Sequence, residues 1–201
     1  MSSSASSEPA SAQDDEQRRR GRRIALVILA CCAAPTVAAW LGYFVWQPRS
    51  RTNYGELVAP RTPDPELRLL DGAPFRLSKL RGKWLLLQID PAACGEGCRT
   101  KLVYTRQVRL ALGKDAERVE RVLLLEDAAN PDASLLREHQ GLVVARAPRG
   151  ALGDFAAPGD PTGWIFVIDP RGNLMLRFPG EPDGRKMLKD LSRLLRASRI
   201  G

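Results

Sequence analysis

The sequence predicts an α/β domain, a central sheet flanked by helices, behind one N-terminal transmembrane helix. An uncharged apolar segment runs over residues 24–46, and strand-like and helix-like patterns then alternate along residues 66–201. Such alternation is typical of a sheet covered by helices. Two cysteines, Cys94 and Cys98, closely follow the most apolar strand-like run. The chain of 201 residues is long enough for one such domain and an extension.

The N-terminal extension predicts a membrane anchor. Residues 1–23 are expected to be a disordered, basic cytoplasmic tail, since they are rich in serine and acidic residues and end in five arginines. As a helix, residues 24–46 would be about 34 Å long, enough to cross a hydrocarbon core of about 30 Å. The arginines should stay in the cytoplasm, which places residues 66–201 outside the inner (plasma) membrane, in the periplasm of a Gram-negative bacterium. A cleaved signal peptide is the alternative, but its apolar core is shorter, about 7–15 residues.

Beyond the membrane, the predicted elements follow the thioredoxin arrangement. Residues 47–65 contain four prolines and are expected to be a linker. The domain at 66–201 should begin with a hairpin around Asp71-Gly72. It should end with a second hairpin and a terminal helix, the close of a thioredoxin-like sheet. The expected elements after the first hairpin are strand 84–90, helix 99–112, strand 119–125, helix 133–140, strand 142–145, hairpin 164–169 and 174–178, and helix 183–198.

The cysteine pair carries the chemistry that this sequence predicts. Cys94 should lie just before a helix and Cys98 in its first turn, where backbone N–H groups favour a thiolate. Gly95 and Gly97 leave the loop free to bring the two sulfurs together. The pair could cycle between dithiol and disulfide or bind Cu(I) through two thiolates. A structural disulfide is the alternative, although so short a loop would stabilise the fold little.

Several segments, in the same order along the chain, resemble the Sco/SenC proteins. That family is membrane-anchored and thioredoxin-like, and serves copper delivery and thiol reduction during assembly of cytochrome c oxidase. The resemblance covers about 66–198. It implies a copper (Cu(I)) site and an oxidase subunit or another assembly factor as partner. The segments that carry it are Leu70–Leu77, Leu80–Lys83, Cys94-x-x-x-Cys98, Glu126-Asp127 and Ile165–Gly172.

The chain departs from this family at the copper-ligand histidine. Family members carry it in an Asp-His-Ser-like run before the Ile-Asp-Pro strand, and the matching run here is Asp160-Pro161-Thr162. Pro161 therefore stands in the slot of the histidine and offers no lone pair. Cys94 and Cys98 remain as the candidate Cu(I) ligands, without an evident third.

Other potential ligands fit a metal site poorly. His139, the only histidine, is expected on the surface of helix 133–140. Met175 and Met187 lie in apolar periodicity and are expected in the core. A structural zinc site would need four ligands, of which two can be named.

Three functions are compatible with these residues. The first is a membrane-anchored, Sco-like assembly factor for cytochrome c oxidase that handles Cu(I), thiol redox or both through Cys94 and Cys98. The second is a membrane-tethered thiol–disulfide reductase, which would be an enzyme. The third is a non-catalytic thioredoxin-like scaffold on a membrane complex. Nucleic acid is not an expected partner, despite a net charge of +8, because no binding motif with interleaved aromatic residues is present.

Overall fold

The computed structural model describes residues 10–45, 53–148, 150–155 and 160–198. The chain divides into two compact units, Met1–Arg51 and Thr52–Gly201.

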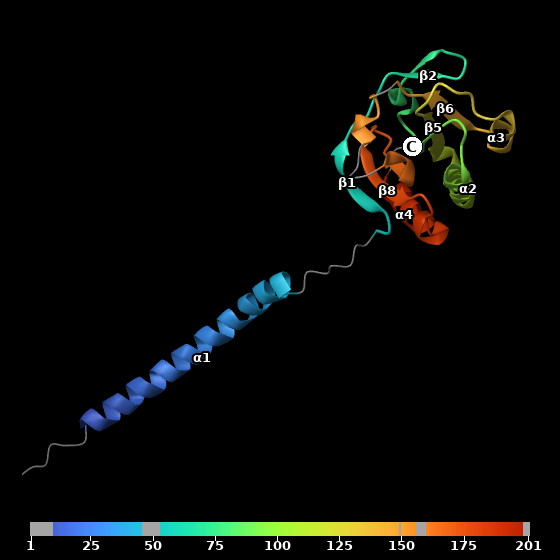
Figure 1. Ribbon diagram of the computed structural model, residues 1–201. Helices are drawn as coiled ribbons and strands as arrows, with labels where there is room; N and C mark the ends of the chain where they lie inside the picture. Colours follow the sequence, from blue (N-terminus) through green and yellow to red (C-terminus); the bar gives the residue numbers. More distant parts are fainter. Residues whose placement is uncertain (1–9, 46–52, 149, 156–159, 199–201) are drawn as a thin grey trace, which may run out of the picture. The chain divides into compact units, whose positions relative to one another are not determined.

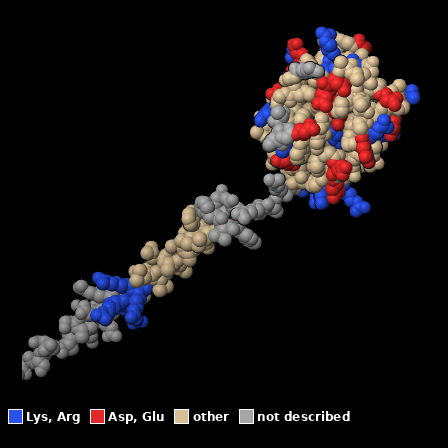
Figure 2. Space-filling model, in the orientation of Figure 1, with Lys and Arg blue, Asp and Glu red and all other residues tan. Residues whose placement is uncertain are grey.

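The described part of the first unit is one long helix, α1 (Ala10–Val45) (Figure 1). Its segment Arg19–Gly42 contains an 18-residue window with a mean hydropathy of 2.3, and is long and apolar enough to cross a membrane. Figure 2 shows this helix as a cluster of basic side chains followed by an uncharged stretch. The predicted apolar helix is therefore present, and it is longer than expected.

The prediction of a disordered tail over 1–23 is wrong for residues 10–23, which belong to α1. Alanine, glutamine, glutamate and arginine are good helix formers, and they extend an existing helix without a new nucleation cost. Residues 1–9 lie outside the described part of the chain.

The second unit is a mixed α/β sheet with flanking helices, as the sequence predicts. Its described strands form one eight-stranded sheet in the order β1-β8-β7-β4-β5-β6-β2-β3. The strands are β1 (Glu56–Arg61), β2 (Leu67–Leu69), β3 (Pro74–Phe75), β4 (Trp84–Asp90), β5 (Val119–Leu125), β6 (Leu142–Arg146), β7 (Trp164–Ile168) and β8 (Leu174–Pro179). The helices are α2 (Glu96–Ala111), α3 (Ala133–Glu138) and α4 (Gly184–Ala197), with 3₁₀ turns η1 (Leu77–Leu80), η2 (Gly113–Arg118), η3 (Gly153–Phe155) and η4 (Pro161–Gly163).

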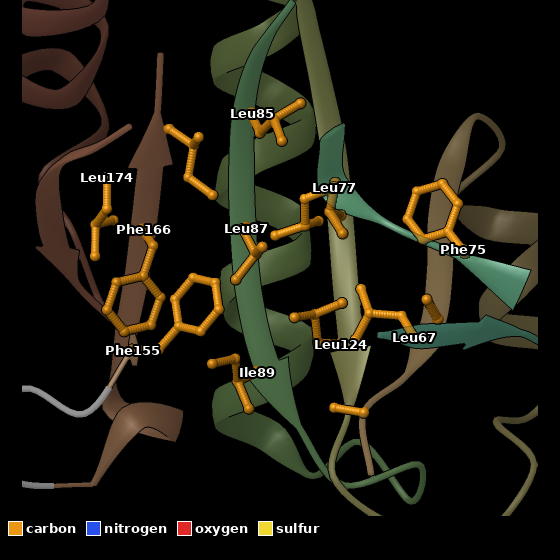
Figure 3. Close-up of a cluster of buried hydrophobic side chains, with 14 residues drawn as sticks. Leu67, Phe75, Leu77, Leu85, Leu87, Ile89, Leu124, Phe155, Phe166 and Leu174 are labelled. Carbon is orange, nitrogen blue, oxygen red and sulfur yellow. The ribbon is translucent and has the colours of Figure 1, made fainter. Parts of the chain in front are cut away.

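Strand β4 is the centre of this sheet. It runs parallel to β5 and antiparallel to β7, and all seven of its residues are buried. Its side chains alternate between two core clusters, as the period of a strand requires. Leu85, Leu87 and Ile89 pack in one cluster, where Phe155 of η3 meets Phe166 of β7 edge to face (Figure 3).

The opposite face of β4 packs against α2 and α4. Trp84 and Leu86 lie there in one cluster with Val108 of α2 and Leu191 of α4. The even-numbered residues of β4 thus face α2, which follows the cysteine loop. This places Gln88 and Asp90 on the side of α2.

The predicted linker over 47–65 is wrong at residues 56–61. These form β1, which pairs antiparallel with β8 through Glu56 opposite Arg177. An edge strand can include a proline, since one of its sides has no ladder partner. Asp190 of α4 accepts hydrogen bonds from the backbone N–H groups of Tyr54 and Gly55, at 2.7 and 2.9 Å. The folded unit therefore begins before residue 66. Residues 47–52 lie outside the described part of the chain.

Candidate functional site

The cysteine loop lies between the end of β4 and the start of α2. Helix α2 begins at Glu96, three residues earlier than expected, and Gly95 is its N-cap. Cys98 is therefore in the first turn, as predicted. The two cysteines form a disulfide with Cα atoms 5.1 Å apart, so the structure brings together the pair that the spacing singled out.

Cys94 has an unusual backbone conformation. Its φ is +42°, in the left-handed region, and it is the one non-glycine residue with positive φ among those described. A residue with a Cβ is disfavoured there, and such conformations persist where the surroundings impose them. The Cys94 N–H donates to the carbonyl of Pro91 at 3.0 Å, and the Arg99 Nε donates to the Cys94 carbonyl at 3.2 Å. These bonds hold the loop in this shape.

The two cysteines differ in what they face. Both are buried, with 3 % and 4 % of their surface exposed. Cys94 lines a surface groove of about 720 Å³ that runs along α2 past Val103 and Tyr104. Cys98 instead contacts the Gln88 side chain beneath it. The two cysteines are equally buried and differ in their neighbours: Cys94, the outer cysteine, borders the groove, and Cys98, the inner cysteine, borders the Gln88 amide.

A buried polar cluster, formed by Gln88, Asp90 and Lys101, lies behind the inner sulfur. The Lys101 Nζ lies 2.8 Å from the Asp90 Oδ1 in an ion pair. The Gln88 Nε2 donates to the Asp90 Oδ2 at 3.0 Å and to the Cys98 Sγ at 3.7 Å. Burial raises the pKa of Asp90 above its usual range, against the opposing effects of Lys101 and Gln88. The disulfide thus rests on a polar, hydrogen-bonded base.

Lys101 also connects this cluster to η4. Its Nζ donates to the carbonyl of Thr162 in η4. Pro161 is the first residue of η4, and Asp160 caps it by accepting from the Thr162 N–H at 2.9 Å. This backbone hydrogen bond lowers the pKa of Asp160. Pro161 therefore occupies the position where the resemblance places a copper-ligand histidine. The next residue, Thr162, is the one bonded to Lys101.

His139 is buried, so its predicted surface position is wrong. Helix α3 ends at Glu138, and His139 is its C-cap, with 2 % of its surface exposed. The chain turns at this point, which directs the imidazole inward, and burial lowers the pKa of His139. Met187 lies in the core, as predicted, whereas Met175 is only partly buried.

The donor set fits a metal only in part. Among the described residues, no group of three or more histidine, cysteine or acidic side chains is arranged to hold an ion. Reduced Cys94 and Cys98 would offer two thiolates, a donor set suited to Cu(I) and not to zinc, which takes four ligands in structural sites.

The polar cluster was missed in reading the sequence, although signals for it exist. Gln88 and Asp90 interrupt an otherwise apolar strand at alternate positions, and so share one face of β4. Lys101 lies three residues after Cys98 on α2, so both side chains fall on the same side of the helix. A polar pair on a buried strand and a lysine on the facing helix together predict an internal ion pair.

Comparisons with known proteins agree with this geometry. The model of the family described as transmembrane-like, thioredoxin-like, C-terminal domain matches residues 84–198. No curated protein matches the sequence.

The similar solved structures include Sco proteins. Apo Sco1 from Thermus thermophilus is 24 % identical, with a TM-score of 0.56 over 74 % of this chain and 98 % of that one. Copper-bound ScoI from Bradyrhizobium japonicum is 20 % identical, with a TM-score of 0.53 over 65 % and 96 %. Copper-bound yeast Sco1 is 14 % identical, with a TM-score of 0.59 over 67 % and 92 %. At these identities the likeness establishes a Sco-like thioredoxin fold.

Proposed function

Because the chain belongs to the family of transmembrane-like, thioredoxin-like C-terminal domains, we propose that it is a membrane-anchored thiol–disulfide reductase that works through Cys94 and Cys98. One observation carries this proposal. The pair lies at the N-terminus of α2 with Cys94 on a surface groove and Cys98 against the Gln88 amide. An outer sulfur can meet a partner while an inner sulfur waits to resolve the bond.

The reaction proceeds by two exchanges. In the reduced protein the Cys94 thiolate attacks one sulfur of a partner disulfide, and the other partner sulfur leaves as a thiolate. The Cys98 thiolate then attacks the Cys94 Sγ, the first partner sulfur leaves, and the Cys94–Cys98 disulfide forms. The partner gains two electrons and the chain loses two. A dithiol reductant on the same side of the membrane returns the chain to its reduced state.

The location proposed for this chemistry is the periplasm, on the outer side of the membrane. It is supported by the arginines that precede the apolar segment of α1, because such residues favour a cytoplasmic N-terminus. The resemblance to Sco/SenC proteins supports a copper-binding subunit of cytochrome c oxidase, or another of its assembly factors, as the partner. Cysteines of such a subunit must be reduced before they bind metal.

Carriage of Cu(I) is a second candidate function. It is supported by the likeness to the copper-bound Sco structures and by two cysteines with Cα atoms 5.1 Å apart. Copper would be cargo here, held by the thiolates of Cys94 and Cys98. Titration of the reduced chain with Cu(I) against a chromogenic chelator tests this candidate, with Cys94→Ser/Cys98→Ser as the control. One-to-one binding that the control lacks supports it, and equal behaviour of the two proteins rejects it.

Trapping of the mixed disulfide tests the proposed reductase. The full chain in detergent is reduced and mixed with an oxidised dithiol peptide, in a background where Cys31 and Cys32 are serines. Cys98→Ser should accumulate a mixed disulfide on Cys94, because the resolving thiol is missing. Cys94→Ser, the matched control, should accumulate little, because its remaining thiol, Cys98, borders the buried Gln88 amide and not the groove. Equal or absent trapping in the two variants would contradict the assignment.

A further inference from the structure

The Gln88 side chain joins the inner cysteine to the buried ion pair. Its Nε2 lies 3.7 Å from the Cys98 Sγ, 3.3 Å from the Cys98 carbonyl oxygen and 3.0 Å from the Asp90 Oδ2. All three are acceptors, and Gln88 is 1 % exposed. Water therefore has little access to this contact. The amide has two N–H hydrogens, so one bonds Asp90 and the other is shared between the Cys98 carbonyl and the Cys98 Sγ.

The ion pair fixes which end of the amide faces Cys98. The Asp90 Oδ1 is occupied by Lys101, which leaves Oδ2 to accept from Gln88. A reversed amide would place its oxygen against the Asp90 carboxylate and the Cys98 carbonyl, which are both acceptors. The Gln88 Oε1 is buried and has no hydrogen-bond partner among the described atoms. Asp90 and Lys101 thus hold an N–H donor against the sulfur at the cost of one unsatisfied oxygen.

We propose that Gln88 is a positioning residue for the thiol chemistry, which donates a hydrogen bond to the Cys98 thiolate and thereby raises the reduction potential of the Cys94–Cys98 pair. This inference rests on the proposed thiol exchange and names the group that tunes it. Hydrogen bonds to an ionised acceptor are about twice as strong as neutral ones, and a water-poor surrounding strengthens them further. A stabilised thiolate stabilises the reduced state, so the pair accepts electrons more readily.

Other groups around Cys98 also affect the ionisation of its thiol. The N-terminus of α2 favours a thiolate at Cys98, and Lys101 adds a positive charge. Asp90 on β4 and Glu126 after β5 are negative and interact with each other. Burial itself favours the neutral thiol. A test must therefore remove the Gln88 donor and leave these charges in place.

The experiment measures the pKa of the Cys98 thiol directly. The full chain in detergent carries Cys31→Ser, Cys32→Ser and Cys94→Ser, so that Cys98 is the only thiol, and its pKa is followed by thiolate absorbance. Gln88→Met removes the donor at similar size, and Gln88→Glu replaces it with a negative acceptor. With Cys94 present, the same two variants are equilibrated with a glutathione redox buffer. Gln140→Met, at an exposed position, is the matched control.

Loss of the Gln88 donor should change the Cys98 thiol pKa and the reduction potential in a defined direction. Gln88→Met should lower the acid dissociation constant of the Cys98 thiol about tenfold, and Gln88→Glu should lower it further. The equilibrium constant for reduction should fall by up to about tenfold, which corresponds to about 30 mV for a two-electron couple. Gln140→Met should match the parent protein.

Three results would overturn the proposal. One is a folded Gln88→Met or Gln88→Glu protein with an unchanged thiol pKa and potential. Another is a shift toward stronger acidity. If neither variant folds, the parent protein decides: the proposal requires that the donors outweigh burial, so a Cys98 pKa at or above the ordinary value of about 8.5 overturns it. These readouts need no partner, so failure of the reductase assignment would appear separately, in the trapping experiment.

Discussion

Lys101 and Asp90 form a buried ion pair, with their side chains 2 % and 6 % exposed and the Nζ 2.8 Å from the Oδ1. The pair links α2 to β4, and the additional bond from Lys101 to the Thr162 carbonyl links both to η4. Helix α2, strand β4 and η4 are therefore joined through one ammonium group. Breaking this junction should affect both the stability of the fold and the geometry of the site.

Removal of one partner of the Lys101–Asp90 pair should lower the free energy of unfolding strongly. Lys101→Met leaves the Asp90 carboxylate buried without its cation, and we expect the free energy of unfolding to fall by about 3–5 kcal/mol. The double variant Asp90→Leu/Lys101→Met leaves no buried charge and should recover part of this loss. Chemical denaturation followed by tryptophan fluorescence measures both. A double variant less stable than Lys101→Met would argue against an unpaired charge as the cause.

Reduction of the disulfide should leave the domain folded. The bond closes a loop with a sequence separation of 4, and a loop this short contributes about 2 kcal/mol through the entropy of the unfolded chain. Denaturation of the oxidised and reduced protein gives the difference, with Cys94→Ser/Cys98→Ser as a control that should match the reduced protein. Loss of the folded state on reduction would instead indicate a structural disulfide.

His139 should make stability depend on pH. Burial lowers its pKa from the ordinary 6.5, an effect to which Arg121 and Arg106 add and which Glu138 opposes. Just below pH 6.5, His139 is therefore protonated in the unfolded chain and still neutral in the folded one. The contribution of His139 is fully present above pH 6.5 and is lost as the pH falls toward the lower, folded-state pKa.

Replacement of this histidine tests that sign. The chain has one histidine, so in His139→Gln the free energy of unfolding should change less between pH 6.5 and 5 than in the parent protein. Denaturation midpoints at several pH values in this window measure the slope. The same slope in His139→Gln as in the parent protein would contradict the assignment, since groups such as Asp90 contribute equally to both.

Pro161→His tests the copper interpretation by restoring the ligand that the chain lacks. Pro161 opens η4 in the slot where the Sco resemblance places a histidine. The substitution should add an imidazole donor and increase copper affinity, most clearly for Cu(II), for which two thiolates are a poor donor set. Competition titrations of the reduced parent and variant compare the two. Unchanged affinity would mean that η4 does not present this position to the cysteines.

The sequence predicted the elements that depend on local pattern. The apolar run of β4, the loop with Cys94 and Cys98 and the start of α2 form a strong signal, because periodicity and glycine punctuation agree there. Strand β1 was missed, since its partner β8 lies more than 100 residues away and Pro60 suggested a linker. The position of His139 was wrong because α3 ends just before it, and helix ends are weakly specified by pattern.

The polar cluster depends on tertiary structure in the same way. Lys101 and Thr162 are 61 residues apart, and their contact exists only once α2 and η4 pack beside β4. Residue types at 88, 90 and 101 signal that something polar is buried. Only the fold determines that it is the inner cysteine that they support.

The reduction potential of the Cys94–Cys98 pair decides whether this disulfide cycles or is a permanent part of the fold. It can be measured on the full chain in detergent, with Cys31 and Cys32 as serines, by equilibration against a series of dithiol redox buffers. We predict a potential above about −300 mV, in the range of disulfides that cycle. A value well below about −300 mV would make the bond a structural one and contradict the proposed thiol exchange.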